Sequence, residues 1–259
     1  MCCLLRILPF IISFLLLPES IGFTEVVDHG SSFIARSQQK KLQSEYIGEK
    51  IIYDVKLGNI VIGKAKFIRL QNTELGGRLV SAMTFETKLA NFKDLEEIYS
   101  DRKNFLPLKV IRHIDTWNSK EKIIENYDQE NFTLTIIKLK GRKKEKIEIH
   151  KKKTIHNAIL LPFYVRQVPG LRIGWHLMAQ LPSQEFRIKL VSIEDLKLSS
   201  GSFEAYRFES VPKKFEIWVS TDKRRIPLKI KDNGKLGYTF VMREYNLGNR
   251  YLVAKKQFF

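Results

Sequence analysis

The sequence predicts a mainly β protein: one large curved antiparallel sheet, an incomplete β-barrel, with one short central helix. From residue 45 onward, apolar and polar residues alternate with a period of two, which is typical of half-buried strands. Short polar turns separate the alternating segments and favour hairpins. About a dozen such segments occur, and so large a sheet must coil, split into a sandwich or close into a barrel.

The first half of the predicted sheet is a series of hairpin-linked strands. In residues 49–58, Ile51, Tyr53 and Val55 share one face, and Gly58 suits the positive φ of a tight turn. One buried and one wet face per strand is typical of an antiparallel meander. Further strands are expected at 61–70, 78–90, 96–104, 106–117, 121–128, 132–140 and 145–153.

The second half resumes the alternation and contains one distinctive hairpin, residues 213–234. In its turn, Asp222 is expected to cap backbone N–H groups, and Arg225 to pair with Asp222 or Glu216. Pro227 fixes φ where the return strand starts. Strands are expected at 186–195, 203–210, 213–220, 226–231 and 238–245.

Residues 156–170 interrupt the alternation with an apolar run and predict the short helix. Asn157 is the candidate N-cap, and Val168-Pro169-Gly170 is a stop signal. The ring of Pro162 would clash with the Ala158 carbonyl in a helix that starts at Ala158, so the helix either starts near Pro162 or is kinked there. It is expected to pack Ile159, Leu160, Phe163 and Tyr164 on the sheet.

The N-terminus has the pattern of a secretory signal peptide. Arg6 precedes an apolar run at 7–17 that is too short for a permanent membrane span. Pro18 follows, and Ser20 and Gly22 have the small-residue spacing that signal peptidase recognises. Cleavage after Gly22 and a periplasmic location are therefore predicted; the alternative is an uncleaved anchor in the inner membrane.

The chain is thus divided into a signal peptide (1–22), a flexible leader (23–44) and a single β-rich domain (45–259). Cys2 and Cys3 both precede the apolar run, so lipidation is not supported and the mature chain would have no cysteine. Disulfides and thiolate chemistry are therefore not expected.

The net charge of +17 favours an anionic partner such as nucleic acid, an acidic polysaccharide or a phospholipid surface. The alternative is a set of solvated, lysine-rich strand faces. Because an exported protein rarely meets nucleic acid, the charge indicates a cell-envelope partner or a peripheral membrane contact. The most basic window is 141–153, whose lysines either contact an anionic surface or protect an edge strand. The candidate contact residues are Lys143, Lys144, Lys151, Lys152 and Lys153.

Motifs for catalysis and metal binding are missing from the sequence. The five histidines do not pair at ligand spacing, and no Gly-x-Ser-x-Gly motif occurs. The carboxylate groups at Asp94, Glu96 and Glu97 and at Glu194 and Asp195 are interpreted as strand ends. We therefore expect a protein that is not an enzyme and that needs no metal or cofactor.

Three landmarks resemble a bacterial exported family, the domain-of-unknown-function family 3108. They are an opening Gly-Glu-x-Leu-x-Tyr motif, a central helix that ends in Arg, and a Trp-x-Ser-x-Asp-x-x-Arg-x-Pro hairpin. The resemblance covers roughly residues 48–242, with Ile in place of Leu in the opening motif and with Asn157 and Pro162 departing from the expected helix. The matching residues are Gly48, Glu49, Ile51, Tyr53, Arg166, Trp218, Ser220, Asp222, Arg225 and Pro227.

The resemblance implies an envelope protein with a curved sheet, similar in outline to periplasmic lipoprotein carriers that hold an acyl chain under a helical lid. It implies no reaction. The leading hypothesis is therefore a non-enzymatic binding module for a lipid or other apolar ligand, and the alternative is an interaction protein that docks on an anionic envelope component. Neither hypothesis fixes the oligomeric state. The candidate ligand-binding residues are Ile159, Phe163, Tyr164, Trp175 and Trp218.

Overall fold

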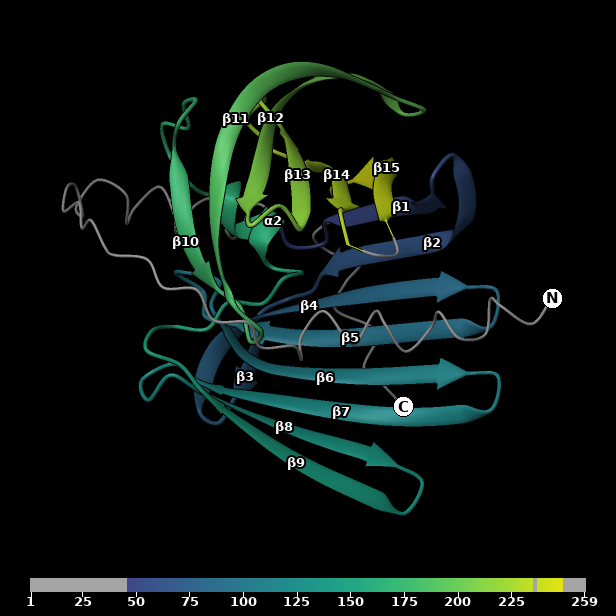
Figure 1. The fold of residues 1–259 in the computed structure, drawn as a ribbon, viewed down its shortest axis with the longest axis vertical. Coiled ribbons are helices and arrows are strands. Elements are labelled where there is room, and N and C mark those ends of the chain that lie inside the picture. The colour runs from purple at the N-terminus through teal and green to yellow at the C-terminus, as the bar shows by residue number, and fades with distance from the viewer. Residues whose placement is uncertain (1–45, 235–236, 249–259) are drawn as a thin grey trace.

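The computed structural model describes residues 46–234 and 237–248, so the predicted signal peptide and leader lie outside the described residues. The described part is one antiparallel sheet of 15 strands that curves around a short helix without closing into a barrel (Figure 1). The predicted fold class is confirmed. Within the described residues, no helix is both long and apolar enough to cross a membrane.

The strands form two meanders, one before α2 (Leu161–Val165) in the chain and one after it. The first contains β1 (Lys50–Leu57), β2 (Ile60–Arg69), β3 (Thr73–Leu75), β4 (Arg78–Leu89), β5 (Phe92–Ser100), β6 (Pro107–Thr116), β7 (Ser119–Asp128), β8 (Thr133–Lys140) and β9 (Lys143–His150). The second contains β10 (His176–Gln180), β11 (Glu185–Leu198), β12 (Gly201–Val211), β13 (Phe215–Ser220), β14 (Pro227–Asp232) and β15 (Tyr238–Asn246).

The pairing of β1 with β15 joins the two meanders into one sheet. The spatial order runs from β10 through β15 to β1, and then through β2 and β4 to β9, with β3 beside β4. Strands β9 and β10 are therefore the two ends of the sheet. Figure 1 shows the second meander curling over the first, so that the two halves face each other across α2.

Helix α2 starts at Leu161, one residue before the proline that complicated its prediction. Pro162 lies in the first turn, where a missing N–H does no harm. The predicted N-cap is wrong: Leu160 occupies that position, and Asn157 instead accepts a 2.9 Å hydrogen bond from the Ile159 N–H in the turn before the helix. The helix is held inside the curve of the sheet by Phe163, whose ring stacks on that of Phe67 with centroids 3.9 Å apart.

The core has two parts because the sheet curls. The larger part lies along β1 to β8 and also includes buried residues of β12 to β15, and the smaller lies between α2 and β10 to β13. The expected alternation is visible in β5, where every second residue from Phe92 to Ser100 is buried. Close strand approach also explains a glycine: a Cβ on Gly63 would lie 2.2 Å from the Lys88 carbonyl oxygen.

Candidate functional site

A cavity of about 920 Å³ lies in the concave side of the curved sheet. Its size is within the range of small-molecule sites, which are concave and mostly apolar. The aromatic and aliphatic residues of its wall come from both meanders and from the segment of α2, which places the cavity between the two halves. The main apolar lining residues are Tyr53, Val55, Phe85, Phe92, Ile114, Ile159, Leu161, Phe163, Phe215, Ile217, Ile230 and Phe240.

Two of the five sequence-predicted ligand residues, Ile159 and Phe163, line this cavity. The other three lie elsewhere. Tyr164 packs edge-on against His156, and Trp175 packs edge-on against Phe208 in the smaller core. Trp218 points to the other face of β13, where its indole N–H donates a 2.6 Å hydrogen bond to Glu194.

The sequence interpretation missed most of the cavity lining, since phenylalanines from strands far apart in sequence converge there. Phe85 and Phe92 come from β4 and β5, whereas Phe215 and Phe240 come from β13 and β15. Period-two alternation shows that each of these residues faces inward. It carries no information on whether an inward residue meets another side chain or a void.

A buried polar cluster forms part of the cavity wall on β5, β6 and β7. Asp94 and Glu96 lie on the inward face of β5, between Phe92 and Ile98, so their interpretation as strand ends is wrong. Arg112 of β6 forms an ion pair with Asp94 and lies with Nε 3.4 Å from the Glu96 carboxylate. The sequence did contain a signal for this placement. Asp94 and Glu96 are two positions apart and alternate in phase with the apolar Phe92 and Ile98, so all four side chains lie on the same face of the strand.

The cluster continues on β7, where Glu125 accepts a 2.6 Å hydrogen bond from the Tyr127 hydroxyl. Glu96, Arg112, Glu125 and Tyr127 are each less than 10% exposed. Burial, together with the charges of Asp94 and Glu125, outweighs the attraction of Arg112 and raises the pKa of Glu96 to about 8. Burial also raises the pKa of Glu125, although the Tyr127 hydrogen bond and Arg112 oppose the rise.

The three family landmarks meet at one buried ion pair behind α2. Arg166 donates two hydrogen bonds to Glu49, of 2.8 and 2.9 Å, and a third, of 2.8 Å, to the Arg224 carbonyl oxygen. Both charged side chains are almost fully buried. Burial disfavours the guanidinium, but Glu49 outweighs it and raises the pKa of Arg166. This ion pair fixes the end of α2 to β1 and to the turn of the 213–234 hairpin.

The hairpin turn has the geometry that its motif predicts, with one difference. Asp222 accepts hydrogen bonds from the backbone N–H groups of Arg224 and Arg225, as expected of a turn-capping carboxylate. Arg225, however, donates to the carbonyl oxygens of Arg166 and Val168, so its predicted pairing with Asp222 or Glu216 is wrong. The turn thereby holds the chain that leaves α2.

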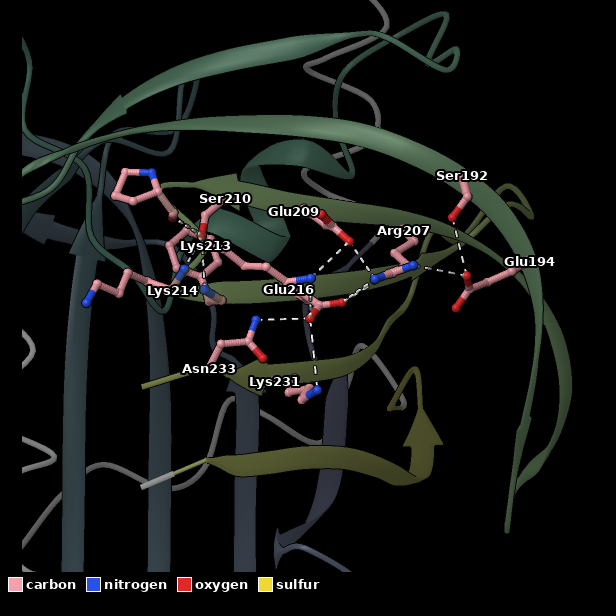
Figure 2. A network of polar contacts seen from close by, with 12 residues as sticks. Ser192, Glu194, Arg207, Glu209, Ser210, Lys213, Lys214, Glu216, Lys231 and Asn233 are labelled. Carbon is pink, nitrogen blue, oxygen red and sulfur yellow. Dashed lines mark hydrogen bonds and ion pairs between the residues drawn. The ribbon is translucent and has the colours of Figure 1, made fainter. Parts of the chain in front are cut away.

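Glu216 belongs to a different polar network, on the face of β13 opposite the cavity (Figure 2). It pairs with Arg207 at 2.7 Å and accepts a 2.9 Å hydrogen bond from Asn233. Arg207 also contacts Glu209. Strand β13 is buried on both faces. Because the charged and polar groups on this face satisfy one another's hydrogen bonds, we interpret the network as structural.

The basic window is split by the geometry of β9. Lys143 and Lys144 lie at the start of this strand, and Lys151 to Lys153 follow its end, so roughly 20–25 Å of extended strand separates the two groups. Lys153 also pairs with Glu185. The five predicted contact lysines therefore form two separate basic patches.

Hairpin tips form a rim on one side of the cavity. The turns that follow β1, β4, β6 and β8 all lie at the same edge of the sheet (Figure 1). Trp117 in the third of these turns lines the cavity and is 77% exposed, and Ile60 beside the first turn is 70% exposed. Lys143 and Lys144 flank the fourth turn. The rim thus combines exposed apolar residues with positive charge.

Among the residues that the structure describes, no group of three or more His, Cys, Asp or Glu side chains is arranged to hold a metal ion.

Comparisons with known proteins identify a family and return two solved structures of low similarity. No curated protein matches the chain. A β-barrel-like protein of the DUF1849 domain of unknown function from Brucella abortus is similar at a TM-score of 0.47 and 7% identity, covering 79% of this chain and 99% of that one. A protein of Bacteroides fragilis with a YmcC-like fold, inferred to be exported, has a TM-score of 0.28 and 9% identity, covering 77% and 96%.

The family model of the protein of unknown function DUF3108 matches residues 52–243, which run from within β1 to within β15 and include α2 and the 213–234 hairpin. The chain therefore belongs to the DUF3108 family.

Proposed function

We propose that this protein is a non-enzymatic binding protein whose cavity holds a lipid chain or another mainly apolar ligand. The observation that carries the proposal is the 920 Å³ cavity in the concave side of the sheet, with its wall of aromatic and aliphatic residues. Small-molecule sites are typically concave, mostly apolar clefts of roughly 300–1,000 Å³. The size and the apolar wall of this cavity support a ligand-binding role.

The position of α2 supports the same function. The helix segment contributes Ile159, Leu161 and Phe163 to the cavity wall, and the Glu49–Arg166 ion pair fixes its end. A wall that is held in place before binding reduces the entropy lost when a ligand is immobilised. The family landmarks therefore have a role in this proposal, which is to hold the cavity wall in position.

A fluorescence experiment tests the proposal. Diphenylhexatriene, a neutral and apolar fluorophore, should become fluorescent when it enters the cavity. The variant Ala158→Trp should reduce the signal, because Ala158 is an exposed residue of the cavity lining and the added indole would occupy part of the cavity. Ser202→Trp places the same indole at an exposed position outside the cavity lining and serves as the control. Equal binding by both variants would contradict the proposal.

We propose in addition that the protein is exported to the cell envelope, on the strength of the signal-peptide pattern at 1–22. N-terminal sequencing of the protein from the envelope fraction should begin at Phe23. Recovery of the chain with Met1 intact from a membrane pellet would instead support an uncleaved anchor.

A second candidate function is docking on an anionic envelope surface, and the rim of hairpin tips is the observation that favours it. Trp117 and Ile60 are exposed on the same edge as Lys143 and Lys144, a combination that suits an interface with anionic lipid. Screening of these exposed charges should make binding to acidic vesicles fall steeply with salt.

The split basic window offers a matched test of this docking. Lys143→Gln with Lys144→Gln should weaken binding to acidic vesicles more than Lys151→Gln with Lys152→Gln, because only the first pair flanks the rim. Equal losses would show that the diffuse net charge of +17 is sufficient. Absence of binding by the parent protein would return the lysines to a solubilising role.

A further inference from the structure

The cavity is acidic although the whole chain carries a net charge of +17. Seven of the residues that line it are ordinarily charged, five of them acidic and two basic. The carboxylates therefore outnumber the cations in the cavity that the proposed ligand would enter. The seven residues are Asp94, Glu96, Glu121, Glu125, Asp232, Arg112 and Lys140.

The positive charge within the cavity is already committed. Arg112 forms ion pairs with both Asp94 and Glu96, and burial leaves its side chain only 6% exposed. Lys140, the other cation, is the last residue of β8, at the hairpin-tip edge of the sheet. Arg112 Nε makes no hydrogen bond, but it lies 3.4 Å from a Glu96 carboxylate oxygen, so an incoming anion would meet a guanidinium that two carboxylates already flank.

One carboxylate oxygen in this cluster lacks a partner. Asp94 is 4% exposed, and its Oδ1 accepts no hydrogen bond, although its other oxygen pairs with Arg112. A buried acceptor without a donor costs free energy comparable to a lost hydrogen bond. A ligand that supplies a donor at this point would recover that cost.

The surrounding titratable groups leave this excess of acceptors in place. On β5, Glu96 lies beside Asp94, and β7 presents Glu125 and Tyr127 to the cluster. The other side of the cavity contributes Asp232 of β14 and Tyr238 of β15. Burial raises the pKa of Glu96 to about 8 and also raises the pKa of Glu125 and of Asp232, but the unpartnered Asp94 oxygen still faces the cavity beside these acceptors. The wall formed by β5 to β7 is therefore built to meet positive charge or N–H and O–H donors.

We propose that the natural ligand is an amphiphile whose polar group is a cationic amine, and that the carboxylates of β5 and β7 receive this group while the apolar wall holds its chain. This inference rests on the proposed function and specifies its ligand class. Long-chain carboxylates are selected against, because like charges brought together in a buried site repel strongly. Neutral alcohols, which supply a donor without a charge, bind with intermediate affinity.

Displacement of diphenylhexatriene from the delipidated protein tests the inference. The competitors are dodecylamine, dodecanol and dodecanoate below their micellar concentrations at neutral pH, since they share one chain and differ only in the polar group. Dodecylamine should displace the probe at a concentration about tenfold or more below that of dodecanoate, which corresponds to about 1.4 kcal/mol. Dodecanol should lie between them.

Glu96→Gln and Glu125→Gln identify the groups responsible. Each change keeps the size of the side chain, and an amide oxygen at position 125 can still accept from Tyr127. Measured against each variant's own affinity for the probe, the preference for the amine should shrink in Glu125→Gln at neutral pH. In Glu96→Gln it should shrink above about pH 8, where Glu96 of the parent protein loses its proton. If one variant fails to fold, the other and the selectivity of the parent protein still decide the question.

The outcomes separate the two proposals. Failure of the parent protein to bind the probe would overturn the proposed function and this inference with it. Probe binding combined with displacement by dodecanoate at the same or a lower concentration than dodecylamine would overturn the inference and leave the binding function standing. A preference for the amine that both variants retain would show that the β5–β7 cluster is not its source.

Discussion

Replacing Glu49 by Gln should destabilise the fold strongly, because the change leaves the buried guanidinium of Arg166 without its counter-ion. Both side chains are at most 3% exposed, and two hydrogen bonds of 2.8 and 2.9 Å join them. Breaking a buried pair by removal of one partner costs about 3 to 5 kcal/mol. The Arg224 carbonyl oxygen would remain as an acceptor for Arg166, but it carries no full charge.

The loss can be measured by thermal unfolding and by urea denaturation. For a domain of this size, 3 to 5 kcal/mol corresponds to a fall in Tm of roughly 6 to 20 °C. Asp115→Asn is the control, because it breaks the exposed pair between Asp115 and Lys120, which are 49% and 84% exposed. Exposed pairs contribute about 0 to 1 kcal/mol.

A double variant distinguishes a lost ion pair from lost packing. Glu49→Leu combined with Arg166→Met removes both charges, and such replacements cost less than leaving one charge unpaired. The double variant should therefore be more stable than Glu49→Gln. If Glu49→Gln unfolds at the temperature of the parent protein, or if the double variant is the least stable of the set, the argument for a buried electrostatic anchor behind α2 is wrong.

Two further predictions concern the hairpin and the acidic cluster. Trp218→Ala should lower the free energy of unfolding by about 3 to 5 kcal/mol, because it removes a side chain that is only 4% exposed. Pro227→Ala should lower it by only about 0.4 to 1 kcal/mol. Equal and small losses of stability in urea denaturation would contradict this prediction. Burial raises the pKa of Glu96 from 4.5 to about 8, so the folded state keeps a proton that the unfolded state releases. The unfolding free energy of the parent protein should therefore fall relative to Glu96→Gln as pH rises from about 4.5 to about 8, and parallel pH profiles would refute the assignment.

The strands were predictable from the sequence because a half-buried strand leaves a period of two. Segments such as 49–58 and 186–195 show it and form β1 and part of β11. The predictions missed the short strands β3 and β10, which have three and five residues and too few positions to show a period. The pairing of β1 with β15 depends on contacts between chain ends and is not encoded in any local pattern.

The candidate site was predictable only in part. Phe163 follows from the apolar break in the alternation, and the structure places it in the cavity wall. Trp218 was predicted as a ligand residue because it is a large anchor on one face of its strand, but β13 is covered on both faces, so alternation does not identify the face that meets the cavity. Asp94 and Glu96 were misinterpreted because carboxylates usually lie at exposed strand ends.

The landmark residues of the family illustrate the same limit. Glu49, Arg166 and Arg225 lie up to 176 positions apart in the sequence, and only the fold shows that they meet around α2. The 213–234 hairpin motif is interpreted as having a structural role, and its contacts support that interpretation.

Native mass spectrometry of the protein purified from the cells that produce it tests the central claim most directly. If the cavity holds an apolar ligand, the intact protein should carry an additional mass that organic solvent extracts, and Ala158→Trp should lose this mass while Ser202→Trp keeps it. A spectrum that contains only the unliganded chain for the parent protein, under conditions that preserve the fold, would contradict the account.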